Sequence, residues 1–134
     1  MSDSIFEVNR PDVTGLGAPV ADYSSIVGVR GGRVLFIAGK GPVDANGKTV
    51  SDDLETQIRQ AMTNMKAVLT VAGAGFADVV KVNAYFTTKD CIPFWKQVRL
   101  ECFPSAFPAA TAIIVVGLAI DDWKVEIEAY AAVP

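Results

Sequence analysis

The chain has 134 residues and a mass of 14.2 kDa, the usual size of one domain. With 51% hydrophobic and 20% charged residues, its composition is globular rather than disordered. A net charge of −3 does not favour binding to nucleic-acid phosphates, and the absence of histidine excludes His-based triads and His metal sites. We therefore expect a single domain over residues 1–134, with no nucleic-acid partner, no metal and no cofactor.

Residues 1–20 contain several prolines and glycines and predict an N-terminal arm without regular structure. The segment lacks the basic and apolar regions of a signal peptide. No apolar run reaches the roughly 18 residues that a membrane span requires. These features indicate a cytoplasmic protein without a membrane partner.

Two extended runs follow, Tyr23–Arg30 and Arg33–Ala38, on either side of the dipeptide Gly31-Gly32. Because both central residues of a primed turn need positive φ, this pattern predicts a β-hairpin. A loop over residues 39–48 comes next, with a turn at Asn46-Gly47.

The clearest helix is predicted over Asp52–Ala72. Asp52 and Glu55 have the spacing of a capping box, and Gly73 stands where a helix C-terminal glycine is expected. Its apolar residues recur every three or four positions, so its methionines indicate core rather than a cofactor contact. The expected inner face consists of Ile58, Met62, Met65, Val68, Leu69 and Ala72.

The second half of the chain alternates strands with one shorter helix. We expect an alternating strand over Val79–Thr88, with Val80, Val82, Ala84 and Phe86 on one face. A helix is predicted over Ile92–Phe103, with Pro93 in its first turn. A strand buried on both faces is expected over Ala110–Val116, and an alternating strand over Lys124–Ala131. The resulting order, β-β-α-β-α-β-β, indicates an α+β sandwich with both helices on one face of the sheet.

The two cysteines, Cys91 and Cys102, are predicted to be free thiols. Eleven residues of helix separate them by roughly 16 Å, which is beyond disulfide reach. A catalytic thiol would need an activating base, and histidine is absent.

The other face of the sheet mixes tyrosine and aliphatic residues with Glu126 and Glu128. A sheet face open to solvent in a monomer should be polar. The mixture favours a face that packs on another subunit and leaves polar clefts.

Three segments together resemble the Rid family of reactive-intermediate deaminases. Arg33–Pro42 (RVLFIAGKGP) resembles its VxFxSGQxP segment, Gln57–Thr88 its central helix and strand, and Val125–Ala129 its last strand. The resemblance covers roughly residues 23–131. It implies the chorismate-mutase-like fold, usually a homotrimer whose sheets form a central barrel with active sites in the clefts between subunits.

Deaminating Rid members hydrolyse 2-imino acids, and an Arg in a PAR(T/S) motif binds the substrate carboxylate in bidentate fashion. Here Ala110 stands at that position. Hydrogen bonds to charged groups contribute about 1.5–3 kcal/mol each. Losing this bidentate contact should therefore weaken substrate binding by roughly two to three orders of magnitude. We expect little or no 2-iminopropionate deaminase activity. Further departures are Ala38, Lys40, Lys96 and Ala112.

The motif positions that are retained are Tyr23, Gly39 and Glu126. The resemblance implies that Glu126 positions the attacking water, and that Tyr23 and the Gly39 backbone contact substrate. Lys96 is expected at the cleft, supplying charge that Ala110 cannot. Each has a structural alternative: an interface ion pair for Glu126, interface packing for Tyr23, a strand-end glycine for Gly39 and a solvated lysine for Lys96.

Two functions therefore stay open. One is an enzyme that deaminates a small carboxylate-bearing imine, an enamine or a related conjugated acid by Glu126-positioned water. The other is a non-catalytic trimer that binds a metabolite and regulates a pathway enzyme. The retained Glu126 favours the first and the missing Arg the second.

Overall fold

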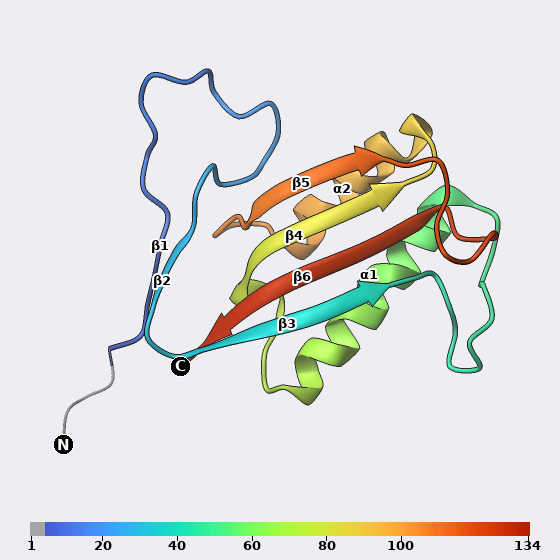
Figure 1. Cartoon of the computed structure of the whole chain (residues 1–134), viewed down its shortest axis with the longest axis horizontal. Helices are drawn as coiled ribbons and strands as arrows, with labels where there is room; N and C mark the ends of the chain where they lie inside the picture. The colour runs from blue at the N-terminus through green and yellow to red at the C-terminus, as the bar shows by residue number, and fades with distance from the viewer. Residues whose placement is uncertain (1–4) are drawn as a thin grey trace.

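A computed structural model describes residues 5–134, so the first four residues of the expected arm lie outside the described part. Two helices pack on one face of a four-stranded sheet, and a short two-stranded ribbon extends beyond the end of that sheet (Figure 1). The strands are β1 Glu7–Asn9, β2 Gly28–Arg30, β3 Arg33–Lys40, β4 Val79–Phe86, β5 Ala109–Ile114 and β6 Val125–Val133. The helices are α1 Leu54–Val71 and α2 Ile92–Cys102, with single 3₁₀ turns η1 Phe76–Asp78 and η2 Lys89–Cys91.

The main sheet has the order β3-β6-β4-β5, with β6 antiparallel to both of its neighbours and β4 parallel to β5. This confirms the expected α+β class, a mixed sheet with both helices on one face. Along β6, Val125, Ile127 and Ala129 are buried while the residues between them are half-buried, as the alternation predicted.

The predicted hairpin around Gly31-Gly32 is wrong in its pairing. Both glycines have positive φ, +72° and +69°, but β2 pairs antiparallel with β1, with Val8 opposite Val29. β1 therefore gives the N-terminal arm a short strand that its composition did not indicate. A side chain at Gly31 would lie 1.9 Å from the backbone oxygen of Ile5, so only glycine fits where the chain passes from the ribbon into β3.

Helix α1 begins two residues later than expected because its N-cap is Asp53, not Asp52. The Asp53 carboxylate accepts a hydrogen bond from the Thr56 backbone nitrogen at 2.9 Å. Gly73, with φ of +74°, follows the end of the helix as expected. The methionines of α1 are confirmed as core, since Met62 and Met65 are buried.

A buried glutamine joins the start of α1 to the start of β6. The Gln57 side-chain nitrogen donates to the backbone oxygens of Ser51 at 2.8 Å and Asp122 at 2.9 Å. Its side-chain oxygen accepts from the Lys124 backbone nitrogen at 2.8 Å. Every hydrogen-bonding group of this buried amide therefore has a partner.

Two strands differ from their predicted burial. A register shift between Val79 and Lys81 inserts one extra residue into β4, so Val79 is buried in the core in place of Val80. β5 is the edge strand of the sheet, and Ile113 and Ile114 are exposed rather than buried on both faces. The apolar run of β5 gave the wrong burial because, apart from a single bridge between Ala109 and Ser24, only its edge towards β4 is paired.

The two cysteines are free, as expected, with Cys91 buried and Cys102 half-buried. Within residues 5–134, no helix has the length and apolar character needed to cross a membrane.

Candidate functional site

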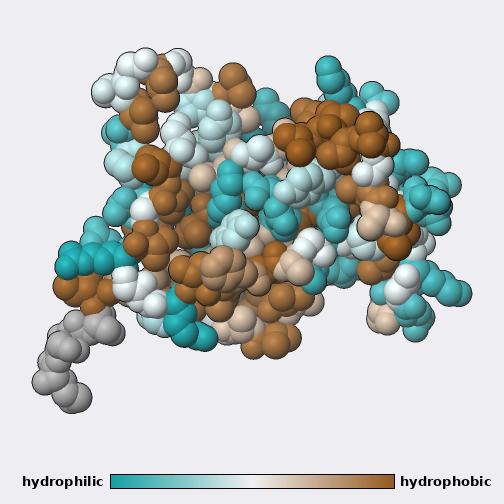
Figure 2. Space-filling model, viewed as in Figure 1, coloured by the Kyte–Doolittle hydropathy of each residue, from teal (hydrophilic) through white to brown (hydrophobic). Residues whose placement is uncertain are grey.

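The face of the sheet that the helices leave uncovered combines apolar patches with a polar centre. Figure 2 shows this face, with hydrophobic surface interleaved with hydrophilic side chains. Val34 and Phe36 of β3 are 49% and 78% exposed, and the Phe36 ring packs edge-on against Tyr130 of β6. Exposed apolar surface of this kind is typical of interaction sites.

Glu128 is held in the polar centre by two neighbours on β4. Its carboxylate accepts from the Tyr85 hydroxyl at 2.5 Å and from the Asn83 side chain at 3.2 Å. The hydrogen bond to Glu128 raises the pKa of Tyr85 to about 12, with burial and nearby carboxylates adding to the shift. Glu128 thus has hydrogen-bond partners within its own sheet.

Glu126 lies two residues earlier on β6, beside a bulge in β3. The register passes from Ile37 opposite Ala129 to Lys40 opposite Ile127, so β3 holds one extra residue there. The bulge contains Gly39, and a side chain at Gly39 would lie 2.5 Å from Oε2 of Glu126. A glycine is therefore needed for the Glu126 carboxylate to approach this backbone, and bulges are frequent beside active sites.

The other expected site residues line a cavity of about 470 Å³ between α2, β5 and the arm. Lys96 and Trp95 come from α2, and Tyr23 from the segment that directly follows the arm. Ala110 of β5 packs against the hydrophobic core, so its methyl group points to the helix side of the sheet. Other lining residues are Val20, Ala21, Ile92, Arg99, Thr111 and Ala112.

Hydrogen bonds to the start of β5 fix the position of Tyr23. The backbone of the next residue, Ser24, donates to the oxygen of Pro108 at 3.0 Å, and its hydroxyl donates to the oxygen of Phe107 at 2.5 Å. Arg10 also donates to Phe107 at 2.9 Å. These bonds tie the arm to the edge of the sheet.

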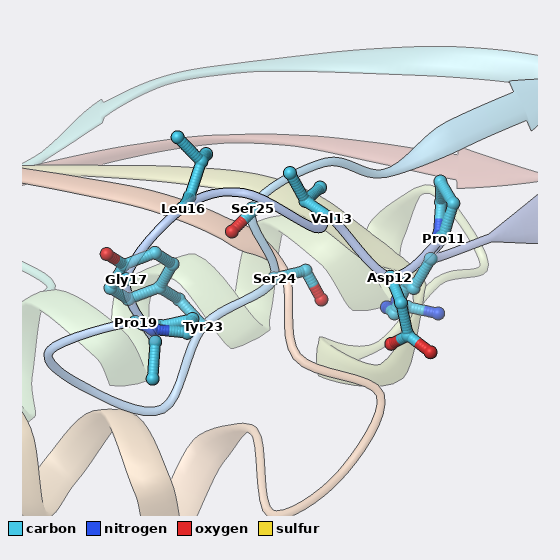
Figure 3. A pocket seen from close by; sticks show the side chains of 11 residues that line it. Pro11, Asp12, Val13, Leu16, Gly17, Pro19, Tyr23, Ser24 and Ser25 are labelled. Atoms are coloured by element: carbon cyan, nitrogen blue, oxygen red, sulfur yellow. The ribbon is translucent and has the colours of Figure 1, made fainter.

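Tyr23 also borders a second hollow, of about 430 Å³, formed by the arm itself. Figure 3 shows Pro19 and Tyr23 at one end of this hollow and Pro11 and Asp12 at the other. Tyr23 therefore separates the arm's own cavity from the α2–β5 cavity.

The structure brings the expected site residues together in two groups. Tyr23, Lys96 and Ala110 share the α2–β5 cavity, whereas Gly39 and Glu126 meet at the uncovered face. Strand β4 stands between β5 and β6 in the sheet order. The α2–β5 cavity is lined by neither Gly39 nor Glu126.

Sequence reasoning did not select Arg99, which lines the same cavity as Lys96. Arg99 is 6% exposed, and its Nε is buried without a hydrogen-bond partner among residues 5–134. Burial lowers the pKa of this guanidinium, and the charges of Asp22 and Tyr23 oppose the shift. The available signal was helix spacing, because Arg99 follows the buried Trp95 by four residues.

Neither a thiol nucleophile nor a side-chain metal site emerges from the described residues. Burial raises the pKa of Cys102 to about 11, which is the opposite of what a reactive thiolate requires. Residues 5–134 contain no group of three or more Cys, Asp or Glu side chains that could hold a metal ion.

Known proteins are similar to this chain over nearly its whole length. Residues 16–133 match the family model described as endoribonuclease L-PSP. A RutC family protein of Pyrococcus horikoshii is 36% identical over 132 residues, covering 98% of both chains. A 2-iminobutanoate/2-iminopropanoate deaminase of Salmonella typhimurium is 34% identical over 85% of this chain and 91% of its own. The solved structure of a Rid family protein of unknown function, YyfB of Yersinia pestis, superimposes with a TM-score of 0.84 at 32% identity, covering 94% of this chain and 98% of its own.

Proposed function

Because the chain belongs to the endoribonuclease L-PSP family, as the Rid proteins do, we propose that it hydrolyses a small imine- or enamine-bearing acid. The water oxygen adds to the carbon of the C=N bond, the C–N bond breaks, and a 2-keto acid and ammonia leave. Glu126 holds the water, accepts its proton during the addition and delivers that proton to the nitrogen as the C–N bond breaks. The similarity to a protein named as an imine deaminase supports this reaction class.

The observation that carries the proposal is the contact between Glu126 and the bare backbone of Gly39 on the uncovered face. The carboxylate occupies space that any side chain at position 39 would take. Unlike Glu128, which accepts hydrogen bonds from Tyr85 and Asn83, Glu126 makes no side-chain hydrogen bond within residues 5–134. Its oxygens are therefore free to hold a water molecule.

The proposed site is completed by a second copy of the chain in a homotrimer. The exposed Val34 and Phe36 supply apolar surface for such contact. In this arrangement Glu126 of one copy faces the α2–β5 cavity of the next, which unites the two groups that one chain keeps apart. Light scattering is expected to give three times 14.2 kDa. A mass near that of one chain would contradict this assembly.

The reaction is tested by generating imino acids with an amino-acid oxidase and following imine loss and ammonia release. Glu126→Gln is expected to lower the hydrolysis rate about 100-fold or more, since general acid–base groups contribute that much. Glu101→Gln, at an exposed position of α2, is the matched control and should leave the rate unchanged. Equal rates for Glu126→Gln and the unmodified chain would contradict the role of Glu126.

Gly39→Ala gives a second test of the same geometry. Its added methyl group should displace the Glu126 carboxylate, because the two would lie 2.5 Å apart. We expect a loss of hydrolysis comparable to that of Glu126→Gln, with circular dichroism unchanged. For 2-iminopropionate the rate should be low even before mutation, because β5 carries Ala110 where the family resemblance places the carboxylate-binding arginine.

Ala110 also favours a second function, a metabolite-binding trimer without catalysis. Tight binding of carboxylates together with no hydrolysis of any imino acid tested would assign that role. We do not propose ribonuclease activity, because the net charge of −3 and the lack of histidine fit RNA cleavage poorly.

A further inference from the structure

Arg99 is a charged group that the fold buries without neutralising. It lies in the last turn of α2 and is 6% exposed, yet no carboxylate forms an ion pair with it among residues 5–134. Asp22 is near enough to raise its pKa, but lies outside ion-pair distance. A buried charge is costly unless it is paired, so this guanidinium calls for a partner that the described chain does not supply.

Arg59 of α1 shows how a guanidinium is fully paired in this fold. Arg59 of α1 donates to both oxygens of Glu101, at 2.7 and 3.2 Å, and lies 3.6 Å from Glu55. Arg59 is half-exposed and paired, whereas Arg99 is buried and unpaired. The contrast identifies Arg99 as a buried guanidinium with free donors.

Arg99 lines the α2–β5 cavity, while its Nε is buried behind the cavity surface. Ala110 stands on the β5 wall of this cavity and Arg99 on its α2 wall. The small side chain of Ala110 leaves open space on the strand side. Lys96 shares the α2 wall but is exposed, so its ammonium keeps its hydration. A ligand in the cavity therefore meets the less hydrated, planar guanidinium on the helix side.

We propose that Arg99 binds the carboxylate of the ligand in the α2–β5 cavity. Arg99 supplies from α2 the positive charge that Ala110 cannot supply from β5. The two terminal nitrogens, which unlike Nε are not among the buried unpartnered atoms, donate two parallel hydrogen bonds to the two carboxylate oxygens. The assignment deepens the proposed function, because the identification of the ligand as a substrate rests on that function. Arg99, rather than Lys96, is then the principal cation of the site.

The walls around Arg99 define the rest of the ligand. Trp95, Ile92 and Val20 offer aromatic and aliphatic surface beside the guanidinium. A volume of about 470 Å³ is larger than a three- or four-carbon acid fills. The ligand class is therefore a monocarboxylate with an apolar or aromatic body.

Calorimetric titration of the full chain with benzoate and 2-oxobutyrate tests the assignment. Arg99→Met should weaken benzoate binding about 10- to 100-fold, the range for losing hydrogen bonds to a charged group. The matched control Arg59→Met should bind benzoate as the unmodified chain does. Benzoate should bind more tightly than 2-oxobutyrate, and uncharged benzamide should bind weakly and equally to the unmodified chain and Arg99→Met.

Two further variants keep the test decisive if Arg99→Met does not fold. Asp22→Asn removes the nearest competing carboxylate and should tighten benzoate binding several-fold. Arg99→Lys keeps the charge but loses the planar fork, so it should restore only part of the affinity. Unchanged affinity in Arg99→Met or Asp22→Asn, or no benzoate binding to the unmodified chain up to about 10 mM, would overturn the proposal.

Glu126→Gln separates this proposal from the function it rests on. If Glu126→Gln still binds benzoate and Arg99→Met does not, the assignment of Arg99 stands even when no imine is hydrolysed. If imines are hydrolysed and Lys96→Met rather than Arg99→Met loses benzoate affinity, the assignment of Arg99 is wrong while the proposed function stands.

Discussion

Two buried polar side chains, Gln57 on α1 and Arg99 on α2, show opposite ways of placing a polar group in an apolar interior. Gln57 is 0% exposed and forms hydrogen bonds with three backbone groups, so all of its hydrogen-bonding groups have partners inside the fold. Arg99 is almost as deeply buried, but its Nε has no partner within residues 5–134. The first arrangement satisfies the polar group within the fold, and the second leaves hydrogen-bonding capacity unused within the described chain.

Replacing Gln57 by Leu should produce the largest stability loss of the variants compared here. The change leaves the oxygens of Ser51 and Asp122 and the nitrogen of Lys124 without their buried partner, at a cost of about 3 kcal/mol. Urea denaturation measures the loss. Gln97→Leu, at an exposed position on α2, is the control and should change the free energy of unfolding little. A small loss in Gln57→Leu would remove one side of the comparison.

Arg99→Met should change stability in the opposite direction. Removing an unpaired buried charge while keeping an apolar side chain should raise the free energy of unfolding by about 1 kcal/mol. The same urea experiment measures it. A loss as large as that of Gln57→Leu would mean that Arg99 is structural and would break the contrast between the two residues.

The Tyr85–Glu128 pair extends the comparison to the uncovered face, where the hydrogen bond can be detected by titrating the Tyr85 hydroxyl. Because Tyr85 has a pKa of about 12 in the fold against 10.0 for an unperturbed tyrosine, its protonated form is favoured by folding. This contribution is complete below about pH 10 and is lost as the pH rises towards 12. Glu128→Gln should return the pKa towards 10.0, measured by phenolate absorbance. No change would show that the hydrogen bond does not form in solution.

Arg59→Met should have the smallest effect on stability. Its guanidinium has carboxylate partners, but these lie at the surface, where solvent and salt screen the attraction. We expect a shift in the urea midpoint close to the error of measurement, and no further shift in 1 M salt. A large, salt-sensitive loss would show that exposed pairing in this fold matters as much as buried pairing.

Local periodicity predicted the elements whose packing is local. The three-and-four spacing of α1 placed Met62 and Met65 in the core, and alternation placed Val125 and Ile127 there. Local periodicity does not indicate which strands pair with each other. The partner of β2 is a three-residue strand in the arm, and nothing in the composition of residues 7–9 indicated a strand. The extra residue in β4 then moved Val79 into the core, because a bulge reverses the alternation.

The candidate site was predictable only where the family resemblance supplied residues. That resemblance named Gly39 and Glu126, which the fold brings close together. Arg99 escaped because a charged residue on an amphipathic helix is normally assigned to the solvent side. Its spacing from Trp95 pointed inward, but spacing alone does not reveal whether a buried guanidinium has a partner.

The position of β6 has a consequence for the order in which the molecule can be assembled. β6 is the last strand along the chain, yet it lies between β3 and β4 in the sheet. During synthesis β3 has no strand to pair with, and the hydrophobic face of α1 has an incomplete sheet beneath it, until residues 125–133 have been made. The core therefore closes in one late step joining distant parts of the sequence, and nascent chains expose β3 and α1 to aggregation or chaperone binding until then.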